Sequence, residues 1–323
     1  MNKDNTINIL ICLDDLDWNY ARHCAVTMLS ILETNKNNKI KFFILSSCLP
    51  EDSIKELKRI AHEYNQEIEF IIRDNIVPDD IKSLLIYHNK NLTRWTRYRL
   101  FFNLYIKDIN RILYLDCDTI VAKDLSEFYN MDMEWKTIVG YYDPPVFRYK
   151  KKNLNTNSYI NAWVLLIDVE KYNNHPITIG AINEVNKAYW QYLNLADQDY
   201  LNILFSDEIL IYKRCINYLA IRPDPLPNKW IDEAIIIHCV IKPYLKYSLC
   251  PRKVIKLYYS YLNKTKRKDY PKEDNSRNIL TYFFELLCHF VYLSIECIFW
   301  IKRVVWFGNL KISERLRNLF HKK

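Results

Sequence analysis

The amino-acid sequence predicts an α/β domain built on a mainly parallel sheet, and three observations lead to this prediction. Short apolar runs alternate with segments whose apolar residues recur at helical spacing. The first elements follow one another as strand, helix, strand, helix, strand, the order that favours parallel pairing with right-handed crossovers. Half of the 323 residues are hydrophobic and 15% are aromatic, which is enough for one large core or two smaller ones.

The strands are expected where the apolar runs lie, at residues 7–13, 39–46, 67–72, 111–115, 137–142, 158–168 and 234–238. Helices are expected through Ser30-Ile31-Leu32, from Pro50 onward, and over residues 91–105, 177–192 and 196–202. Glu51 and Asp52 follow Pro50, and both proline and acids are favoured in the first turn of a helix.

Glycine is too scarce for a glycine-rich phosphate loop, because the chain contains only Gly140, Gly180 and Gly308. The dinucleotide fingerprint and the Walker A loop are therefore both excluded. The nine cysteines include no C-x-x-C pair, which argues against a disulfide framework and a structural zinc site and favours a reducing cytosol. The first residues run directly into an apolar strand, so no signal peptide is expected and a cytoplasmic location is predicted.

The basic excess lies at the C-terminal end, which divides the chain into a catalytic domain of residues 1–250 and an extension of residues 251–323. From Arg252 to Lys323 there are 16 Lys or Arg and 6 Asp or Glu, against a net charge of +8 for the whole chain. Nucleic-acid binding is therefore not expected. Within the extension, residues 279–301 are largely apolar and predict an amphipathic helix that attaches the protein peripherally to the inner, anionic face of a membrane. The alternative is a C-terminal helix that completes the fold.

The most informative stretch runs from Arg111 to Val121, where an apolar strand ends in Asp116-Cys117-Asp118. In open α/β sheets, ligands bind at the carboxyl ends of the strands. Two carboxylates one residue apart repel each other, and a divalent cation such as Mg²⁺ or Mn²⁺ removes that cost. The alternative is an acidic loop exposed to solvent.

Two further strands also end in residues that can bind a metal, namely Asp14-Asp15 and His238. A carboxylate pair with one imidazole is a mixed oxygen and nitrogen site, for which Mn²⁺ is the expected ion. A metal of this kind, without a glycine loop, suits a nucleoside diphosphate leaving group, because the cation offsets the charge that develops on it. The pattern therefore favours a sugar nucleotide as the substrate.

Five blocks of the sequence resemble, in the same order, the retaining glycosyltransferases of family 8, which include glycogenin and bacterial lipooligosaccharide α-galactosyl- and α-glucosyltransferases. The blocks are Arg99 with the helix before it, the D-x-D stretch over residues 112–121, Tyr159-Ile-Asn161-Ala, Asp197-Gln198-Asp-Tyr-Leu-Asn, and His238 followed by Lys242-Pro-Tyr. The resemblance covers about Ile7 to Tyr244. It implies a GT-A (Rossmann-like) fold, transfer of galactose or glucose from a UDP-hexose with retention of configuration, Mn²⁺ or else Mg²⁺ as cofactor, and a lipopolysaccharide-type glycan acceptor.

The resemblance also implies roles for individual positions. The metal ligands would be Asp116, Asp118 and His238. The donor would be held by Asp14 and Tyr20 at the uridine, by Arg99, Asp143 and Asn161 at the sugar, and by Lys242 at the diphosphate. Asp197 and Gln198 are the catalytic candidates: Asp197 would hold the donor sugar, and Gln198 would lie near the anomeric carbon on the acceptor side.

Three departures from the family pattern affect these roles. Trp163 stands where the family has glycine, the segment from His238 to Lys242 is shortened, and Leu16-Asp17-Trp18 is an insertion before Tyr20. A bulky ring at Trp163 could narrow the site or displace Asn161.

Two other functions fit parts of the pattern. Asp116-Cys-Asp-Thr119 also resembles the motif of haloacid-dehalogenase-type phosphatases, although the glycine of that motif is missing. A non-catalytic sugar-nucleotide-binding relic is the other alternative. For single residues the structural alternatives are a core histidine at His238, a backbone hydrogen-bonding role for Asn161, and helix N-terminal acids at Asp197 and Asp199.

Overall fold

The computed structural model describes most of the chain up to residue 268. The described residues are 6–15, 20–85, 94–143, 147–175, 177–195, 197–220, 229–240, 242–244, 250–266 and 268. The insertion at residues 16–18 and the predicted helix at residues 279–301 lie outside them. None of the helices in the described ranges has the length and apolar character needed to cross a membrane.

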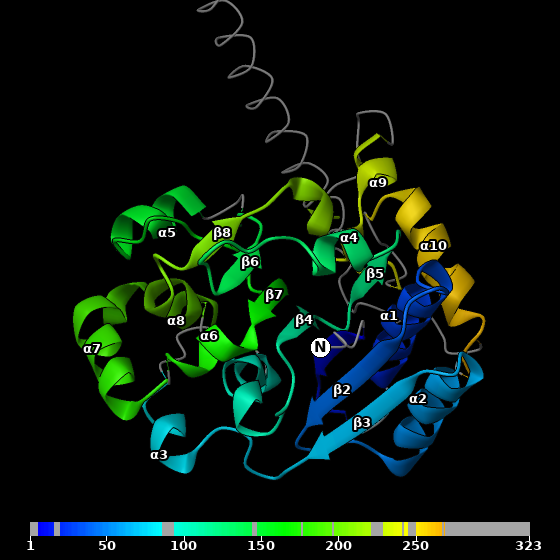
Figure 1. The fold of residues 1–323 in the computed structure, drawn as a ribbon, viewed down its shortest axis with the longest axis horizontal. Coiled ribbons are helices and arrows are strands. Elements are labelled where there is room, and N and C mark those ends of the chain that lie inside the picture. Colours follow the sequence, from blue (N-terminus) through cyan, green and yellow to red (C-terminus); the bar gives the residue numbers. More distant parts are fainter. Residues whose placement is uncertain are drawn as a thin grey trace, which may run out of the picture. The chain divides into compact units, whose positions relative to one another are not determined.

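The described residues form a seven-stranded sheet and a separate three-stranded sheet (Figure 1). In spatial order the large sheet contains β3 (Glu67–Ile72), β2 (Ile40–Ser46), β1 (Ile7–Cys12), β4 (Arg111–Leu115), β7 (Val164–Asp168), β6 (Ile138–Gly140) and β8 (Ile209–Ile211). The small sheet contains β5 (Thr119–Val121), β10 (Ile236–His238) and β9 (Tyr218–Leu219). In the large sheet only β7 runs antiparallel to its neighbours, so the predicted mainly parallel sheet is confirmed.

Helices pack around these sheets. They are α1 (Ala21–Thr34), α2 (Glu51–Glu63), α3 (Asp79–Lys82), α4 (Ser126–Tyr129), α5 (Phe147–Asn153), α6 (Val169–Asn173), α7 (Ile179–Tyr189), α8 (Asp197–Leu204), α9 (Lys229–Glu233) and α10 (Arg252–Leu262). Short 3₁₀ helices occur at Arg94–Leu100, Phe102–Leu104, Trp190–Tyr192 and Arg214–Ile216.

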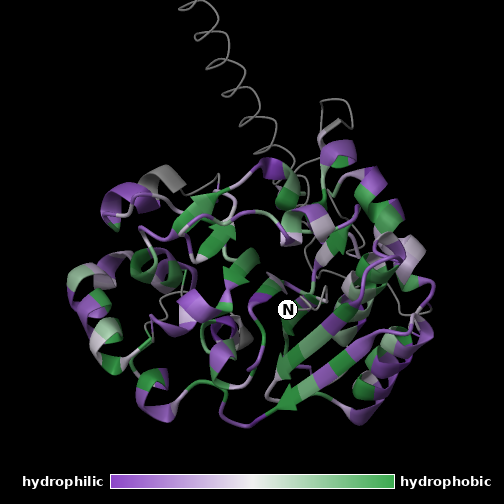
Figure 2. Cartoon of the chain, viewed as in Figure 1, coloured by the Kyte–Doolittle hydropathy of each residue, from purple (hydrophilic) through white to green (hydrophobic). Residues whose placement is uncertain are grey.

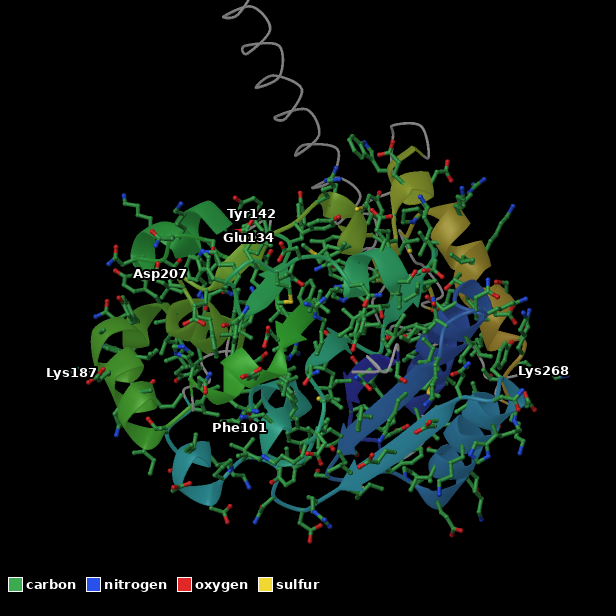
Figure 3. All side chains as sticks on the ribbon, in the orientation of Figure 1. Phe101, Glu134, Tyr142, Lys187, Asp207 and Lys268 are labelled. Carbon is green, nitrogen blue, oxygen red and sulfur yellow. The ribbon has the colours of Figure 1, made fainter. Side chains whose placement is uncertain are left out.

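Burial explains why the strands differ in composition. The central strands β4 and β7 are almost entirely buried and mostly hydrophobic, as expected for strands covered on both faces (Figure 2). The edge strand β3 is half exposed, and its Glu67 and Glu69 pair with Lys39 and Lys41 of the neighbouring strand region. Charges on an edge strand oppose pairing with another chain. In Figure 3, Phe101 lies among the packed elements, whereas the exposed Lys187 and Lys268 point outward.

Helix α10 packs against α1, although the sequence-based division assigned it to the extension. Tyr258 of α10 is buried, and its hydroxyl lies 2.6 Å from Nδ1 of the buried His23 on α1. The compact unit to which both helices belong comprises residues 1–244 and 248–271.

The helix predicted over residues 91–105 is only partly correct, because the helical winding is 3₁₀. In the described part of this segment the chain forms two 3₁₀ helices, Arg94–Leu100 and Phe102–Leu104. Tyr98, Phe101 and Phe102 are all buried, and their spacing of three and four residues places them on one side of a helix. The tighter i to i+3 winding, as in the bond from Phe101 N to Tyr98 O at 3.0 Å, accommodates them.

The strand predicted over residues 158–168 is only partly correct, because the ladder begins at Val164. Before it, the side chain of Asn161 accepts a hydrogen bond from the backbone N–H of Trp163 at 3.0 Å. This local bond is an Asx turn, which competes with strand pairing and bends the chain. The bend turns Asn161 toward the site described below.

Candidate active site

Three residues that can bind a metal converge where β4 passes into β5. One ligand atom from each of Asp116, Asp118 and His238 lies within 4.8 Å of the other two. Asp116 directly follows β4, and His238 lies opposite Thr119 because β10 pairs antiparallel with β5. The backbone N–H of Cys239 donates to Asp118 O at 3.0 Å. His238 therefore reaches the site through the small sheet and not from the edge of the large one.

Helix α1 holds the turn that contains both aspartates. The hydroxyl of Thr27 lies 2.9 Å from Cys117 O and 2.7 Å from Thr119 O. Within the turn, the hydroxyl of Thr119 donates to Asp116 O at 2.8 Å. These bonds satisfy buried backbone carbonyls and fix the direction in which the two carboxylates point.

The surroundings of Asp118 suit a bound cation. Its Oδ2 is paired with the ammonium of Lys242, and its Oδ1 lies 3.1 Å from Nε2 of His238. Burial alone would raise the pKa of Asp118, but the charges of Lys242 and His238 outweigh that effect and hold the pKa below its usual range. No hydrogen bond of good geometry from the described residues reaches the buried Oδ1, and Nδ1 of His238 also has no such partner. A buried carboxylate oxygen without a donor is costly, and a divalent cation would satisfy it.

Arg99 connects the metal-ligand candidate Asp116 with Asp197. The guanidinium is 2% exposed, and its Nη2 lies 3.3 Å from Asp116 while its Nε lies 2.9 Å from Asp197. Burial raises the pKa of Asp197 to about 6, against the opposing charge of Arg99. Burial also raises the pKa of Asp116, again opposed by Arg99. The same Nε–H donates to the backbone oxygen of Thr96 at 2.8 Å, and Nη1 donates to the backbone oxygen of Ala162.

A second polar cluster adjoins the first and contains Asp143, Asn161 and Gln198. The Oδ2 of Asp143 accepts from Nε2 of Gln198 at 2.8 Å and from Nδ2 of Asn161 at 3.3 Å. The Oε1 of Gln198 accepts from the backbone N–H of Ala162 at 3.0 Å. All three side chains are buried, and burial raises the pKa of Asp143 although both amides oppose it. Asp143 and Asn161, two of the residues predicted to bind the sugar, thus share one hydrogen-bonded cluster with Gln198.

Trp163 joins the two clusters. Its backbone O accepts from the N–H of Asp116 at 3.0 Å, and its backbone N–H donates to Asn161. Its ring meets the imidazole of His238 edge-on, with centroids 4.2 Å apart. The bulky ring is therefore accommodated against His238, and Asn161 keeps its contacts with Asp143 and Gln198.

Asp14 organises a loop with its carboxylate. It accepts hydrogen bonds from the backbone N–H of Ser47 at 2.7 Å, from the hydroxyl of Ser47 at 3.0 Å and from the hydroxyl of Tyr98 at 2.8 Å. Tyr20 lies just before α1, where burial and the negative charge of nearby Asp118 raise its pKa well above the usual value. Their predicted contacts with uridine stay predictions.

Several residues of the site were not found from the sequence. The hydroxyl of Tyr114 donates to the carboxylate of Asp116, and Asn217 donates to Asn161 Oδ1 at 3.0 Å. Tyr114 is one residue of an apolar strand, and Asn217 lies in a loop without a motif, so no sequence pattern marked either of them. The segment between His238 and Lys242 is shorter than the family pattern, and the structure places the ammonium of Lys242 on Asp118.

Comparison with known proteins identifies the class to which this fold and site belong. Residues 8–240 match Glycosyl transferase family 8, and the chain belongs to that family. General stress protein A of Bacillus subtilis is 30% identical over 215 residues, which span 64% of this chain and 72% of that protein. A lipopolysaccharide 1,2-glucosyltransferase of Escherichia coli is 26% identical over 214 residues, which span 62% of this chain and 60% of that protein.

A solved structure supports the fold. The galactosyltransferase LgtC, crystallised with donor and acceptor sugar analogs, has a TM-score of 0.66 and 22% identity, with 80% of this chain and 96% of that chain covered. The fold is therefore GT-A, and the protein is a glycosyltransferase. Both the phosphatase and the non-catalytic alternatives are set aside by this assignment.

Proposed function

We propose that the protein transfers galactose or glucose from a UDP-hexose to a lipopolysaccharide-type surface glycan, with retention of anomeric configuration and with Mn²⁺ as the bound metal. The convergence of Asp116, Asp118 and His238 within 4.8 Å is the observation that supports this proposal most directly. A relative that is named as a lipopolysaccharide glucosyltransferase supports the acceptor class.

The metal would be held by Asp116, Asp118 and His238. Mn²⁺ at this position supplies Lewis-acid stabilisation of the leaving diphosphate. Mg²⁺ is the alternative, although an imidazole ligand favours a transition metal over Mg²⁺.

The protein side chains supply position and charge. Lys242 is paired with Asp118 and would turn its ammonium to the diphosphate when a cation takes over the charge of that carboxylate. Asp143 and Asn161 offer hydrogen-bonding groups to the sugar from a preformed cluster. Gln198, fixed by the same cluster, would border the anomeric carbon on the acceptor side. Preorganised polar groups of this kind act without further reorganisation during the reaction.

The test is release of UDP from UDP-galactose and UDP-glucose, measured with Mn²⁺ and with EDTA. Loss of an outer-shell residue of a metal site typically costs about 10–100-fold, so Asp118→Asn, which removes a ligand charge, is expected to lower UDP release by at least about 100-fold. The matched control is Asp232→Asn, since this acid is exposed and its carboxylate pairs with Lys253 at the surface. UDP release that is independent of metal, or equal in the two variants, would contradict the proposal.

The stereochemical part has its own test. Proton NMR of the sugar transferred to a glycan acceptor, or to water, distinguishes the α from the β product as it forms. An α product from an α-linked donor is expected, and an initial β product would contradict retention.

A further inference from the structure

A buried ion pair lies behind Gln198, away from the candidate metal ligands. Lys150 of α5 is 1% exposed, and its Nζ lies 2.8 Å from Oδ2 of Asp199, which is fully buried on α8. The same oxygen accepts from the backbone N–H of Leu195 at 2.7 Å. The other oxygen of Asp199 accepts from the hydroxyl of Tyr159. Both ions are therefore hydrogen-bonded within the protein.

Stability alone does not account for this pair. Removing two charges from water costs several kcal/mol per ion, and replacement by well-packed apolar residues is often neutral or stabilising. The desolvation is visible at Lys150, where burial lowers the pKa of the ammonium while Asp199 opposes the shift. A buried pair that is expensive and fully hydrogen-bonded can instead fix the orientation of its neighbours.

The hydroxyl of Tyr159 links Asp199 to Gln198, because it has only one proton to donate. An ionised carboxylate only accepts hydrogen bonds, so the single proton of the Tyr159 hydroxyl points to Asp199. The hydroxyl oxygen then has only lone pairs to offer in other directions. It lies 3.3 Å from Nε2 of Gln198, which must be the donor.

Gln198 is consequently fixed in one of two possible amide orientations. Its NH₂ group faces two acceptors, the hydroxyl of Tyr159 and Oδ2 of Asp143. Its oxygen faces the backbone N–H of Ala162. If the amide were flipped, its oxygen would face two hydrogen-bond acceptors, and its NH₂ group would face an N–H donor. The Tyr159 hydroxyl, oriented by Asp199, therefore acts together with Asp143 and the N–H of Ala162 to set which side of Gln198 carries the oxygen.

We propose that Lys150 and Tyr159, acting through Asp199, are positioning residues that hold the amide of Gln198 in the orientation required for sugar transfer. The catalytic relevance rests on the proposed function of Gln198 at the anomeric carbon, whereas the amide orientation rests on the hydrogen bonds alone. The side-chain polar contacts of Lys150 and Tyr159 are made to Tyr192, Asp199 and Gln198.

The decisive variant is Tyr159→Phe, which removes one oxygen atom from a buried ring and leaves the Lys150–Asp199 pair in place. The matched control is Tyr172→Phe, because Tyr172 is equally buried and its hydroxyl donates to Leu100 O at 2.9 Å, outside the cluster. We expect Tyr159→Phe to lower kcat for UDP release about tenfold, the equivalent of ~1.4 kcal/mol. The Kd for UDP with Mn²⁺ should stay unchanged, because the groups proposed to hold the diphosphate are untouched.

A double-variant cycle shows whether the effect passes through Gln198. Tyr159→Phe should lower kcat in the native background and have no further effect in Gln198→Ala, since interacting residues are non-additive. An equal drop in both backgrounds, an equal drop in Tyr172→Phe, or an unchanged kcat in Tyr159→Phe would overturn the proposal.

A measurement without turnover tests the orientation independently. The chain contains three glutamines, Gln66, Gln191 and Gln198, so glutamine-selective ¹⁵N labelling gives side-chain NH₂ signals that Gln198→Ala assigns. We expect the NH₂ of Gln198 to exchange with solvent faster in Tyr159→Phe and at the native rate in Tyr172→Phe. An unchanged exchange rate in Tyr159→Phe would overturn the proposal that Tyr159 positions the amide of Gln198. If the native protein releases no UDP, the proposed function fails, and the exchange rate still decides the orientation.

Discussion

Replacing Arg99 with methionine tests how much the positive charge of Arg99 contributes to the stability of the candidate site. The guanidinium is 2% exposed and lies 3.3 Å from Asp116 and 2.9 Å from Asp197. Arg99→Met keeps an apolar stem of similar length but leaves the buried Asp197 and the partly buried Asp116 without their shared cation. Breaking a buried ion pair by removing one partner costs about 3–5 kcal/mol, so the free energy of unfolding should fall by that amount near neutral pH.

The loss should depend on pH in a defined direction. Burial raises the pKa of Asp197 to about 6, above the value of about 3.9 in an unfolded chain. A group whose pKa is raised on folding contributes stability that is present below about pH 4 and is lost as the pH rises through 6, here about 3 kcal/mol. Without Arg99 the pKa of Asp197 rises further, and the penalty at high pH grows. The difference in the free energy of unfolding between the native protein and Arg99→Met should therefore increase from pH 5 to pH 8.

The assay is urea denaturation at pH 5 and pH 8, followed by tryptophan fluorescence, with EDTA present so that metal binding does not contribute. The control is Lys41→Met, which removes a surface pair to Glu69 at 2.9 Å and should cost about 1 kcal/mol or less at both pH values. A gap for Arg99→Met that is equal at the two pH values, or larger at pH 5, would refute the electrostatic reasoning.

Two other changes have expected outcomes. Thr27→Val removes the hydroxyl that holds the carbonyls of Cys117 and Thr119, and should lower the free energy of unfolding by about 1–2 kcal/mol and weaken Mn²⁺ binding in calorimetry. Thr34→Val on the same helix, whose hydroxyl donates to Ser30 O, should leave Mn²⁺ affinity unchanged; equal weakening in both variants would contradict a specific role for Thr27. A chain ending at Arg277 should keep its donor hydrolysis and no longer sediment with anionic vesicles. Vesicle binding that survives the truncation would contradict attachment through the basic extension.

The sequence predicted those parts of the site that depend on local pattern. An apolar run that ends in two acids marks a buried strand and a candidate metal site, and β4 with Asp116 lies as expected. The sequence predicted that His238 lies near the two aspartates because all three residues follow strand ends. The structure brings His238 to the site in a different way. Its strand pairs antiparallel with β5 in a second sheet, and a strand of three residues carries no signal for the sheet it joins.

Other features depend on distant contacts that no pattern encodes. Asp199 was interpreted as a helix N-terminal acid, and the structure adds a fully buried pair with Lys150, 49 residues away. The 3₁₀ winding around Phe101 and the local Asx turn at Asn161 replace the regular helix and the longer strand that the residue pattern predicts. Strand β8 was missed because three apolar residues at a sheet edge resemble any short apolar run.

Titration with Mn²⁺ tests the metal site most directly. Electron paramagnetic resonance of free Mn²⁺ gives the number of ions bound per chain without any need for the correct sugar donor. The proposed site predicts one bound ion per native chain, no change in Asp232→Asn, and loss of that ion in Asp118→Asn and in His238→Ala. Mn²⁺ binding of native stoichiometry and affinity in both site variants would contradict it.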